Sequence, residues 1–205
     1  SVFALSKSEY KEANKVTTNC IYVPVFHGNE VNTLLSEHGK YAFYHGDLRL
    51  ADNKRAAQFL IEVFKEILDY NLIIASSNGK HFIENNLHTV SNVKFVEIKD
   101  ENHLDELFAN AHINVMLSFQ ESGTKLKVIN SLFKSRFCLI NKNMVDDEQV
   151  LSLCEIAATK QDFINKIIDL KNKPYNQIEM KKKVLNDIFN DIKNAKLIEQ
   201  KITFV

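Results

Sequence analysis

The sequence has few of the residues that form sharp turns, with five glycines and two prolines in 205 positions. A sandwich or barrel of many short strands needs frequent turns, so this scarcity argues against those folds. No run of 18 apolar residues occurs, so no transmembrane segment is expected. No charged segment followed by an apolar one opens the chain, so a signal peptide is not expected either. Because the first residue is Ser1 rather than Met, we expect a processing site or an artificial boundary there.

The chain also lacks an excess of charge of either sign, since 26 Lys and Arg residues balance 26 Asp and Glu residues. General nucleic-acid binders are usually basic, so that class is not expected. The three cysteines, Cys20, Cys138 and Cys154, contain no C-x-x-C pair. They indicate reduced, buried thiols in a cytoplasmic protein. The seven histidines have no metal-ligand spacing, so no metal or other cofactor is expected.

What the sequence does contain is a regular series of short apolar runs, and each run is typical of a strand. Most lack alternation with polar residues, as in parallel strands that are buried on both faces. The eight runs are Val2–Leu5, Ile21–Val25, Tyr41–His45, Leu72–Ala75, Val93–Ile98, Ile113–Leu117, Phe137–Ile140 and Glu155–Ala158.

Helical patterns separate these runs. Residues 51–68 have an apolar stripe at steps of three and four, and Asp52 or Asn53 can cap the first turn. The stripe consists of Ala56, Phe59, Leu60, Val63, Phe64 and Ile67. Further helices are expected at 103–111, 125–134, 162–170 and 184–198. Strands that alternate with helices predict an α/β fold with a doubly wound parallel sheet.

The α/β domain is expected to span residues 40–173, and the two ends of the chain differ from it. Residues 1–39 predict a strand, a short helix, a second strand and a polar linker or mobile loop. Residues 174–205 predict extra C-terminal helices, in which Lys181–Lys183 should face water. There an apolar stripe needs a partner surface, and it consists of Val184, Ile188, Ile192 and Ala195.

The best candidate for a ligand site is the stretch "SGTKLK", which follows a buried strand and starts a helix. Ligands of open α/β sheets bind beyond the carboxyl ends of the strands, and helix N-termini favour anions. Gly123 permits close backbone approach, Ser122 and Thr124 offer hydroxyls, and Lys125 and Lys127 add positive charge. The alternative is a capped turn that starts a buried helix, with both lysines in water. The spacing matches neither G-x-G-x-x-G nor G-x-x-x-x-G-K-[ST], so a dinucleotide site or a Walker site is not expected.

Two weaker candidates lie at the end of the first strand of the domain. His45 could contact a ligand, or it could be a hydrogen-bonded and partly buried histidine. Arg49 could reach a diphosphate, or it could be a surface arginine.

Three segments together resemble a known family: "YHGDLRLADNKRAAQFL", "LIIASSNGK" and "DELFANAHINVMLSFQESGTKLKVINSLFKSRFCLI". Their order and spacing, over about residues 40–170, resemble the C-terminal, donor-binding half of GT-B glycosyltransferases of the retaining, glycogen-synthase-like group. The resemblance implies a Rossmann-like domain that binds a nucleotide-diphosphate sugar without a metal. It also implies that residues 1–25 end an N-terminal domain of the same protein, which holds the acceptor and the catalytic residues. The chain alone should therefore transfer nothing.

The resemblance also implies a donor-binding set. Backbone amides of 122–125 and the lysines would hold the diphosphate, and the backbone at Ile98 would meet the base. Asn130 stands where the family has its ribose-binding glutamate, and Glu121 lies near the position of a second glutamate. Two turn residues, Gly46 and Ser76, complete the set. Asp47 replaces the arginine that the family has after its first glycine, so Arg49 or Lys54 would substitute.

Those departures leave a second interpretation open: a degenerate α/β module that binds a partner through its terminal helices. A flavodoxin-like receiver domain is not expected, because no acidic cluster follows the first strand of the domain. The sequence leaves the donor sugar, the acceptor, the oligomeric state and any peripheral contact with a membrane open.

Overall fold

The computed structural model describes residues 1–85, 90–120 and 123–202, and it has an α/β architecture. Six parallel strands form the main sheet in the order β5-β4-β3-β6-β7-β8. The strands are β3 (Tyr41–His45), β4 (Leu72–Ser76), β5 (Val93–Glu97), β6 (Ala111–Met116), β7 (Phe137–Ile140) and β8 (Glu155–Ile156). The predicted doubly wound parallel sheet is confirmed. Sequence order runs outward from the adjacent central pair β3 and β6.

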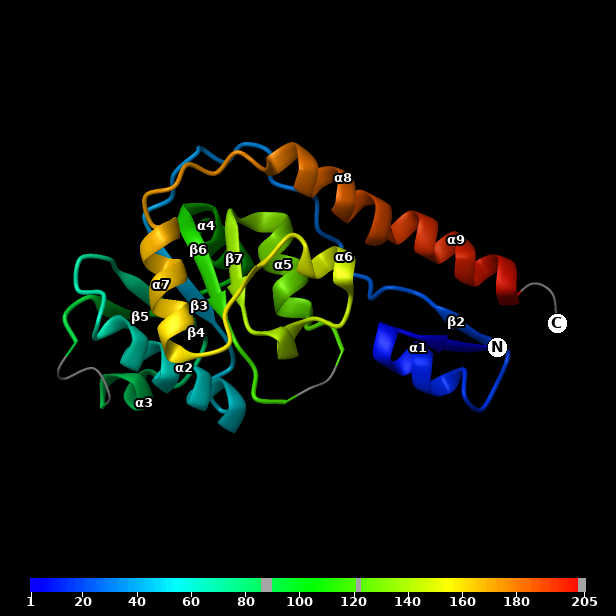
Figure 1. Cartoon of the computed structure of the whole chain (residues 1–205), viewed down its shortest axis with the longest axis horizontal. Helices are drawn as coiled ribbons and strands as arrows, with labels where there is room; N and C mark the ends of the chain where they lie inside the picture. Colours follow the sequence, from blue (N-terminus) through cyan, green and yellow to red (C-terminus); the bar gives the residue numbers. More distant parts are fainter. Residues whose placement is uncertain (86–89, 121–122, 203–205) are drawn as a thin grey trace.

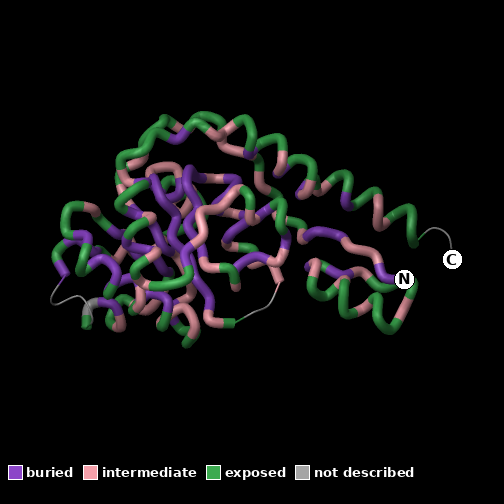
Figure 2. Tube along the Cα trace, viewed as in Figure 1, coloured by how far each residue is buried: buried purple, intermediate pink, exposed green. Residues whose placement is uncertain are grey.

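The strands lack polar alternation because helices cover both faces of the sheet. Every residue of β6 and β7 is buried, and Figure 2 shows the buried trace in the middle of the domain. The first and largest core cluster joins one face to α2 (Ala51–Phe64) and α7 (Lys160–Leu170). On the other face, α4 (Glu101–Asn110) and α5 (Leu126–Lys134) each pack in a core cluster of their own.

Some local features differ from the sequence-based expectations. Three short elements were not predicted: α3 (Lys80–Glu84), the 3-10 turn η1 (Lys142–Met144) and α6 (Glu148–Leu151). They are too short to show an apolar period. The expectation that Asp52 or Asn53 caps α2 is wrong, because α2 starts at Ala51 and Leu50 occupies the cap position. Both side chains bond elsewhere, at the site described below.

The N-terminal residues form a small separate unit of β1 (Val2–Ala4), α1 (Lys7–Ala13) and β2 (Cys20–Tyr22) (Figure 1). The Ser6 side chain caps α1 by accepting a hydrogen bond from the Glu9 amide. Hydrogen bonds to Asp146 join this unit to the main domain. The Asp146 carboxylate accepts hydrogen bonds from the amide and the hydroxyl of Ser8, at 2.8 and 2.7 Å.

Residues 27–39 form no helix or strand, but hydrogen bonds hold this linker against the sheet. Arg136, which is buried just before β7, donates to the carbonyl and the hydroxyl of Ser36 at 2.7 and 2.8 Å. The Gly39 amide donates to Nδ1 of buried His112 at 3.0 Å. The linker is therefore held by hydrogen bonds to two buried polar side chains, Arg136 and His112.

The C-terminal segment differs from the single helix expected over 184–198. Two helices, α8 (Ile178–Ile188) and α9 (Asp191–Ile202), are separated at 189–190, where Asn190 caps α9. The apolar stripe was predicted only in part, because Ile188 packs against the core but Ile192 is 70% exposed. The buried residues in this segment are Lys181, Leu185, Phe189 and Asn194. Lys181 is 2% exposed, so the expectation that it faces water is wrong.

The helices α8 and α9 extend from the sheet domain toward the end of the molecule where both chain termini lie (Figure 1). None of the helices in the described part of the chain is both long enough and apolar enough to cross a membrane.

Candidate functional site

A cavity of about 230 Å³ lies between the segments that follow the central strands β3 and β6. From these neighbouring strands the chain leads to α2 on one face and to α5 on the other. Open α/β sheets bind ligands at such a switch point. The cavity is lined by Leu50, Asp52, Asn53, Ser118, Gln120, Lys125, Lys127 and Met144.

A hydrogen bond between Lys127 and Asn53 joins the two sides of this cavity. The Lys127 ammonium donates to Asn53 Oδ1 at 2.9 Å, and it lies 5.4 Å from the centre of the Tyr44 ring. Asn53 Nδ2 donates to the Asp47 carbonyl at 3.0 Å, which fixes the orientation of the amide. Lys127 is therefore directed across the switch point rather than into solvent.

A second set of contacts shapes the loop that follows β6. The Ser118 hydroxyl donates to Asp52 Oδ2 at 3.0 Å, and the Phe119 amide donates to Asp52 Oδ1 at 3.3 Å. Asn141 bonds to both backbone groups of Ser118, at 3.1 and 2.8 Å. The Arg55 guanidinium lies over the Phe119 ring at 3.7 Å. These bonds fix the first residues after β6 relative to the start of α2.

The charges around the cavity favour an anion. Burial lowers the pKa of Lys127, the Asp52 carboxylate opposes that shift, and the charge of Lys125 adds to it. The first turns of α2 and α5 both begin at residues that line or adjoin the cavity. A helix N-terminus stabilises an anion by about 0.3–1 kcal/mol, and two cationic side chains add to this. The arrangement can hold a phosphate group.

The residues of the glycine loop are in part already bonded to neighbours. Gly123 has φ +38° and lies against Ser6, so a Cβ there would come within 2.9 Å of the Ser6 Cβ. The Thr124 hydroxyl donates to Asp146 Oδ1 at 2.9 Å, and the Lys125 amide donates to the Met144 carbonyl at 2.9 Å. Two other predicted members, Glu121 and Ser122, lie outside the described residues. Of the predicted loop residues, the structure brings Lys125 to the cavity beside Lys127.

The predicted residues after β3 support the cavity more than they line it. Asp47 and Arg49 form a two-pronged ion pair, with Arg49 Nη2 2.7 Å from Asp47 Oδ2, at the surface of the loop. The Arg49 hydrogen bonds hold the pKa of the Asp47 carboxyl well below its usual range. Gly46 lies beneath Asn53, so a Cβ at Gly46 would be 3.0 Å from Asn53 Cγ. A small residue at 46 therefore allows Asn53 to reach Lys127.

The other predicted residues lie outside the cavity lining. Ser76 is buried and its hydroxyl accepts from the Leu48 and Asn78 amides at 3.4 and 3.3 Å, which supports the loop after β3. Ile98 follows the edge strand β5, and its amide donates to the Ser76 carbonyl at 3.0 Å. Asn130 lies one turn beyond Lys127 on α5, and its Oδ1 accepts from Asn29 in the linker at 2.8 Å.

His45 is half-buried, and its ring lies 5.0 Å from the Phe108 ring and 5.8 Å from the Phe43 ring. Its Nδ1 is enclosed and has no hydrogen-bond partner among the described residues. Burial, together with the charges of Lys127 and Lys134, lowers the pKa of His45 to about 3. It is therefore a neutral ring that packs against Phe43 and Phe108.

Sequence reasoning missed the site roles of Asp52, Asn53, Ser118 and Asn141. The sequence shows Asp52 and Asn53 at a helix start, where capping is the usual role of these residue types. Their bonds to Ser118 and Lys127 span more than sixty residues, so no local pattern reveals them. Ser118 could have been found as the first polar residue after β6, the strand next to β3.

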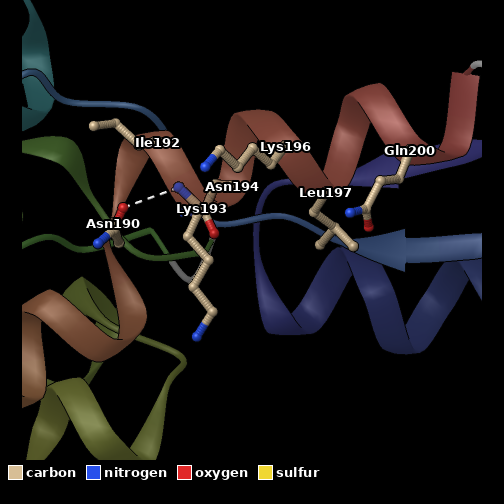
Figure 3. Close-up of a pocket in the computed structure, with 7 residues that line it drawn as sticks. All are labelled: Asn190, Ile192, Lys193, Asn194, Lys196, Leu197 and Gln200. Carbon is tan, nitrogen blue, oxygen red and sulfur yellow. Dashed lines mark hydrogen bonds between the residues drawn. The ribbon is translucent and has the colours of Figure 1, made fainter.

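Two other cavities are less suited to chemistry. One of about 530 Å³ is lined only by Asn190 and residues of α9, whose side chains are amides, lysines and aliphatic groups (Figure 3). The other, of about 280 Å³, lies between the linker and the helices α4 and α5, and it includes the Lys134–Asp105 ion pair. Within the described residues, His, Cys, Asp and Glu side chains form no group of three or more that could hold a metal ion.

Solved structures share this fold at low sequence identity. HepE from Anabaena, in complex with UDP and glucose, matches all of this chain with a TM-score of 0.70 and 10% identity. AviGT4, a glycosyltransferase involved in avilamycin A biosynthesis, matches 97% of the chain with a TM-score of 0.65 and 14% identity. The pneumococcal O-GlcNAc transferase GtfA, in complex with UDP and GlcNAc, matches 95% with a TM-score of 0.63 and 12% identity.

These likenesses show the fold, and the expected Rossmann-like α/β half of the GT-B kind is confirmed. The chain spans 63%, 62% and 42% of the lengths of HepE, AviGT4 and GtfA, respectively. No model of a protein family matches the sequence, and no curated protein matches it.

Proposed function

We propose that this chain is the donor-binding half of a glycosyltransferase that uses a nucleotide-diphosphate sugar. The observation that carries the proposal is the cationic cavity at the β3/β6 switch point, where Lys127 reaches across to Asn53. Likeness in fold to proteins described in complex with UDP supports it. The acceptor would be held by an N-terminal domain of the same protein, in the cytoplasm.

In this proposal the chain acts on the leaving group. Lys125, Lys127 and the start of α5 would stabilise the negative charge that develops on the diphosphate as the sugar leaves. Positive charge from lysines and helix ends would do this without a metal ion. The ribose would meet Asn130 and the base would meet the backbone near Ile98, as the resemblance implies. The proposal includes that the transferred sugar keeps its anomeric configuration.

Two observations favour the second candidate, a degenerate binding module. Asp47 holds Arg49 in an ion pair, so this arginine is not available to a diphosphate without breaking that pair. The Asn130 side chain already bonds to Asn29. A neutral amide also binds a ribose hydroxyl less strongly than a carboxylate does.

The test is calorimetric titration of UDP and GDP into this chain and into a version extended upstream to include the adjoining domain. Donor binding predicts that one nucleotide binds both proteins, and more tightly the extended one. Lys127→Ala should weaken binding about 10- to 100-fold, because a charge-assisted hydrogen bond contributes about 1.5–3 kcal/mol. Gly123→Asp should abolish it by adding a negative charge at the loop.

Lys183→Ala is the matched control, because it removes an equivalent charge from the exposed side of α8. Nucleotide binding with no sugar transfer or donor hydrolysis by the extended protein would favour the degenerate module. If neither nucleotide binds the extended protein, the enzyme proposal fails.

A further inference from the structure

Two cysteines lie side by side at one edge of the sheet, one in a strand and one directly before the neighbouring strand. Cys138 lies in β7, and Cys154 directly precedes β8. The register pairs Leu139 with Glu155 and Ile140 with Ile156. Continuing it by one residue, to the bend at Cys154, brings Cys138 opposite Cys154. Neighbouring strands lie about 4.8 Å apart, and a disulfide needs Cα atoms about 4.4–6.8 Å apart. The spacing of these backbones therefore suits a disulfide, although both thiols are free.

The two side chains also share one core cluster, in which Cys138 is a buried member and Cys154 packs against it. Cys154 Sγ also donates to the Val150 carbonyl at 3.4 Å. Cys138 is 1% exposed and Cys154 is half-buried, so small molecules would reach the pair from the Cys154 side.

A buried lysine accompanies the two thiols. Lys181, on α8, donates to the Ser135 carbonyl and lies 4.9 Å from the centre of the Tyr175 ring. Its positive charge favours the thiolate forms of both Cys138 and Cys154. Burial lowers the pKa of Lys181 to about 7, against the opposing effect of Cys138. Near neutral pH this amine can accept a proton from a neighbouring thiol.

We propose that Cys138 and Cys154 form an oxidisable dithiol that hydroperoxides convert to a disulfide, with Lys181 as the base. Lys181 takes the Cys138 proton, and the thiolate attacks one peroxide oxygen and breaks the O–O bond. This gives a sulfenic acid and, with that proton, water. The Cys154 thiol then attacks the sulfenic sulfur, which forms the S–S bond and releases a second water. Two thiols are oxidised by two electrons, and one hydrogen peroxide is reduced to two waters.

Cys20 provides an internal reference, because it is buried in β2 and belongs to the separate N-terminal unit. A general effect of oxidant on buried thiols would change Cys20 together with the other two cysteines. A site built around Lys181 would change only Cys138 and Cys154.

The experiment treats the protein with hydrogen peroxide, blocks the remaining thiols with iodoacetamide after unfolding, and maps the peptides by mass spectrometry. We expect a Cys138–Cys154 cross-link that dithiothreitol reverses, with Cys20 fully alkylated. Cys154→Ser should stop the reaction at a sulfenic acid on Cys138, which dimedone traps. Lys181→Met keeps the length of the side chain and should slow cross-linking at least about tenfold, because the thiolate is the reacting species.

Thermal melts of each variant establish that it is folded before its oxidation rate is compared. Complete alkylation of Cys138 and Cys154, as of Cys20, with no cross-link after peroxide treatment would overturn the proposal. So would cross-linking that Lys181→Met leaves at the original rate.

Discussion

Lys127 Nζ lies 2.9 Å from Asn53 Oδ1, and this contact joins the segments that follow the two central strands of the sheet. Lys127 belongs to the first turn of α5, and Asn53 belongs to the first turn of α2. The amide of Asn53 is fixed in turn by the Asp47 carbonyl and the Tyr44 hydroxyl. The position of the partly buried Lys127 ammonium therefore depends on Asn53, a neutral side chain for which the sequence indicated only a capping role.

Substitution of Asn53 should lower the affinity for nucleotide without any change to a lysine. Asn53→Leu removes the acceptor that orients Lys127, and we expect UDP affinity to fall about tenfold, near the value of one hydrogen bond to a charged group. Asn53→Asp should weaken binding further, because a carboxylate would pair with Lys127 and repel the diphosphate. Calorimetric titration measures both, with Asn186→Asp on the exposed side of α8 as the charge-matched control. Tighter binding by Asn53→Asp would contradict the anion site.

Gly46→Ala tests the contact between Lys127 and Asn53 by displacing the Asn53 side chain. The new Cβ would lie 3.0 Å from Asn53 Cγ, so the amide must shift by a few tenths of an ångström away from its present place. We expect a several-fold loss of UDP affinity with little change in melting temperature. Gly39→Ala is the contrasting variant, because its Cβ would lie 2.4 Å from the His112 backbone nitrogen, which cannot move aside. It should lower the melting temperature strongly, since overpacking costs about 1–3 kcal/mol or more.

The sequence was sufficient for the sheet because unbroken apolar runs such as Phe137–Ile140 are too short for buried helices and alternate with longer helical patterns. The site was predicted only in part. Lys125 and Lys127 could be placed because they follow a strand and a glycine, but Asn53 and Ser118 act through contacts between distant segments. Lys181 shows the same limit: a run of three lysines is normally solvated, and only the packing of α8 on α5 buries the first.

His45→Phe should make the protein less sensitive to acid. Because the folded-state pKa of His45 is lowered to about 3, the unfolded chain takes up the proton first, near its ordinary pKa of about 6.5. The stability that the neutral ring contributes is complete above pH 6.5 and is lost as the pH falls toward 3, by up to about 1.4 kcal/mol per unit.

Phenylalanine keeps the contacts with Phe43 and Phe108 and removes this loss, along with the unpaired Nδ1. Urea unfolding at pH 7.5, 6, 5 and 4 measures the free energy of unfolding of both proteins. The pH dependence that remains in the variant comes from the other titrating groups, including His112. Equal slopes for the two proteins below pH 6.5 would show that His45 is not a buried neutral group.

Asn130→Glu tests whether this position meets the ribose, as the resemblance to GT-B enzymes implies. The Asn130 oxygen accepts one hydrogen bond, from Asn29 at 2.8 Å, and a glutamate could keep that bond and accept another from a ribose hydroxyl. A hydrogen bond to a charged group contributes about 1.5–3 kcal/mol, so UDP affinity should rise about tenfold or more. The gain should be smaller for the 2′,3′-dideoxy analogue of UDP, which lacks the hydroxyls in question. Asn130→Gln is the matched control for side-chain length, and it should bring no gain. If Asn130→Glu binds both nucleotides with unchanged or lower affinity, the ribose lies elsewhere, and the assignment of Asn130 to the ribose fails.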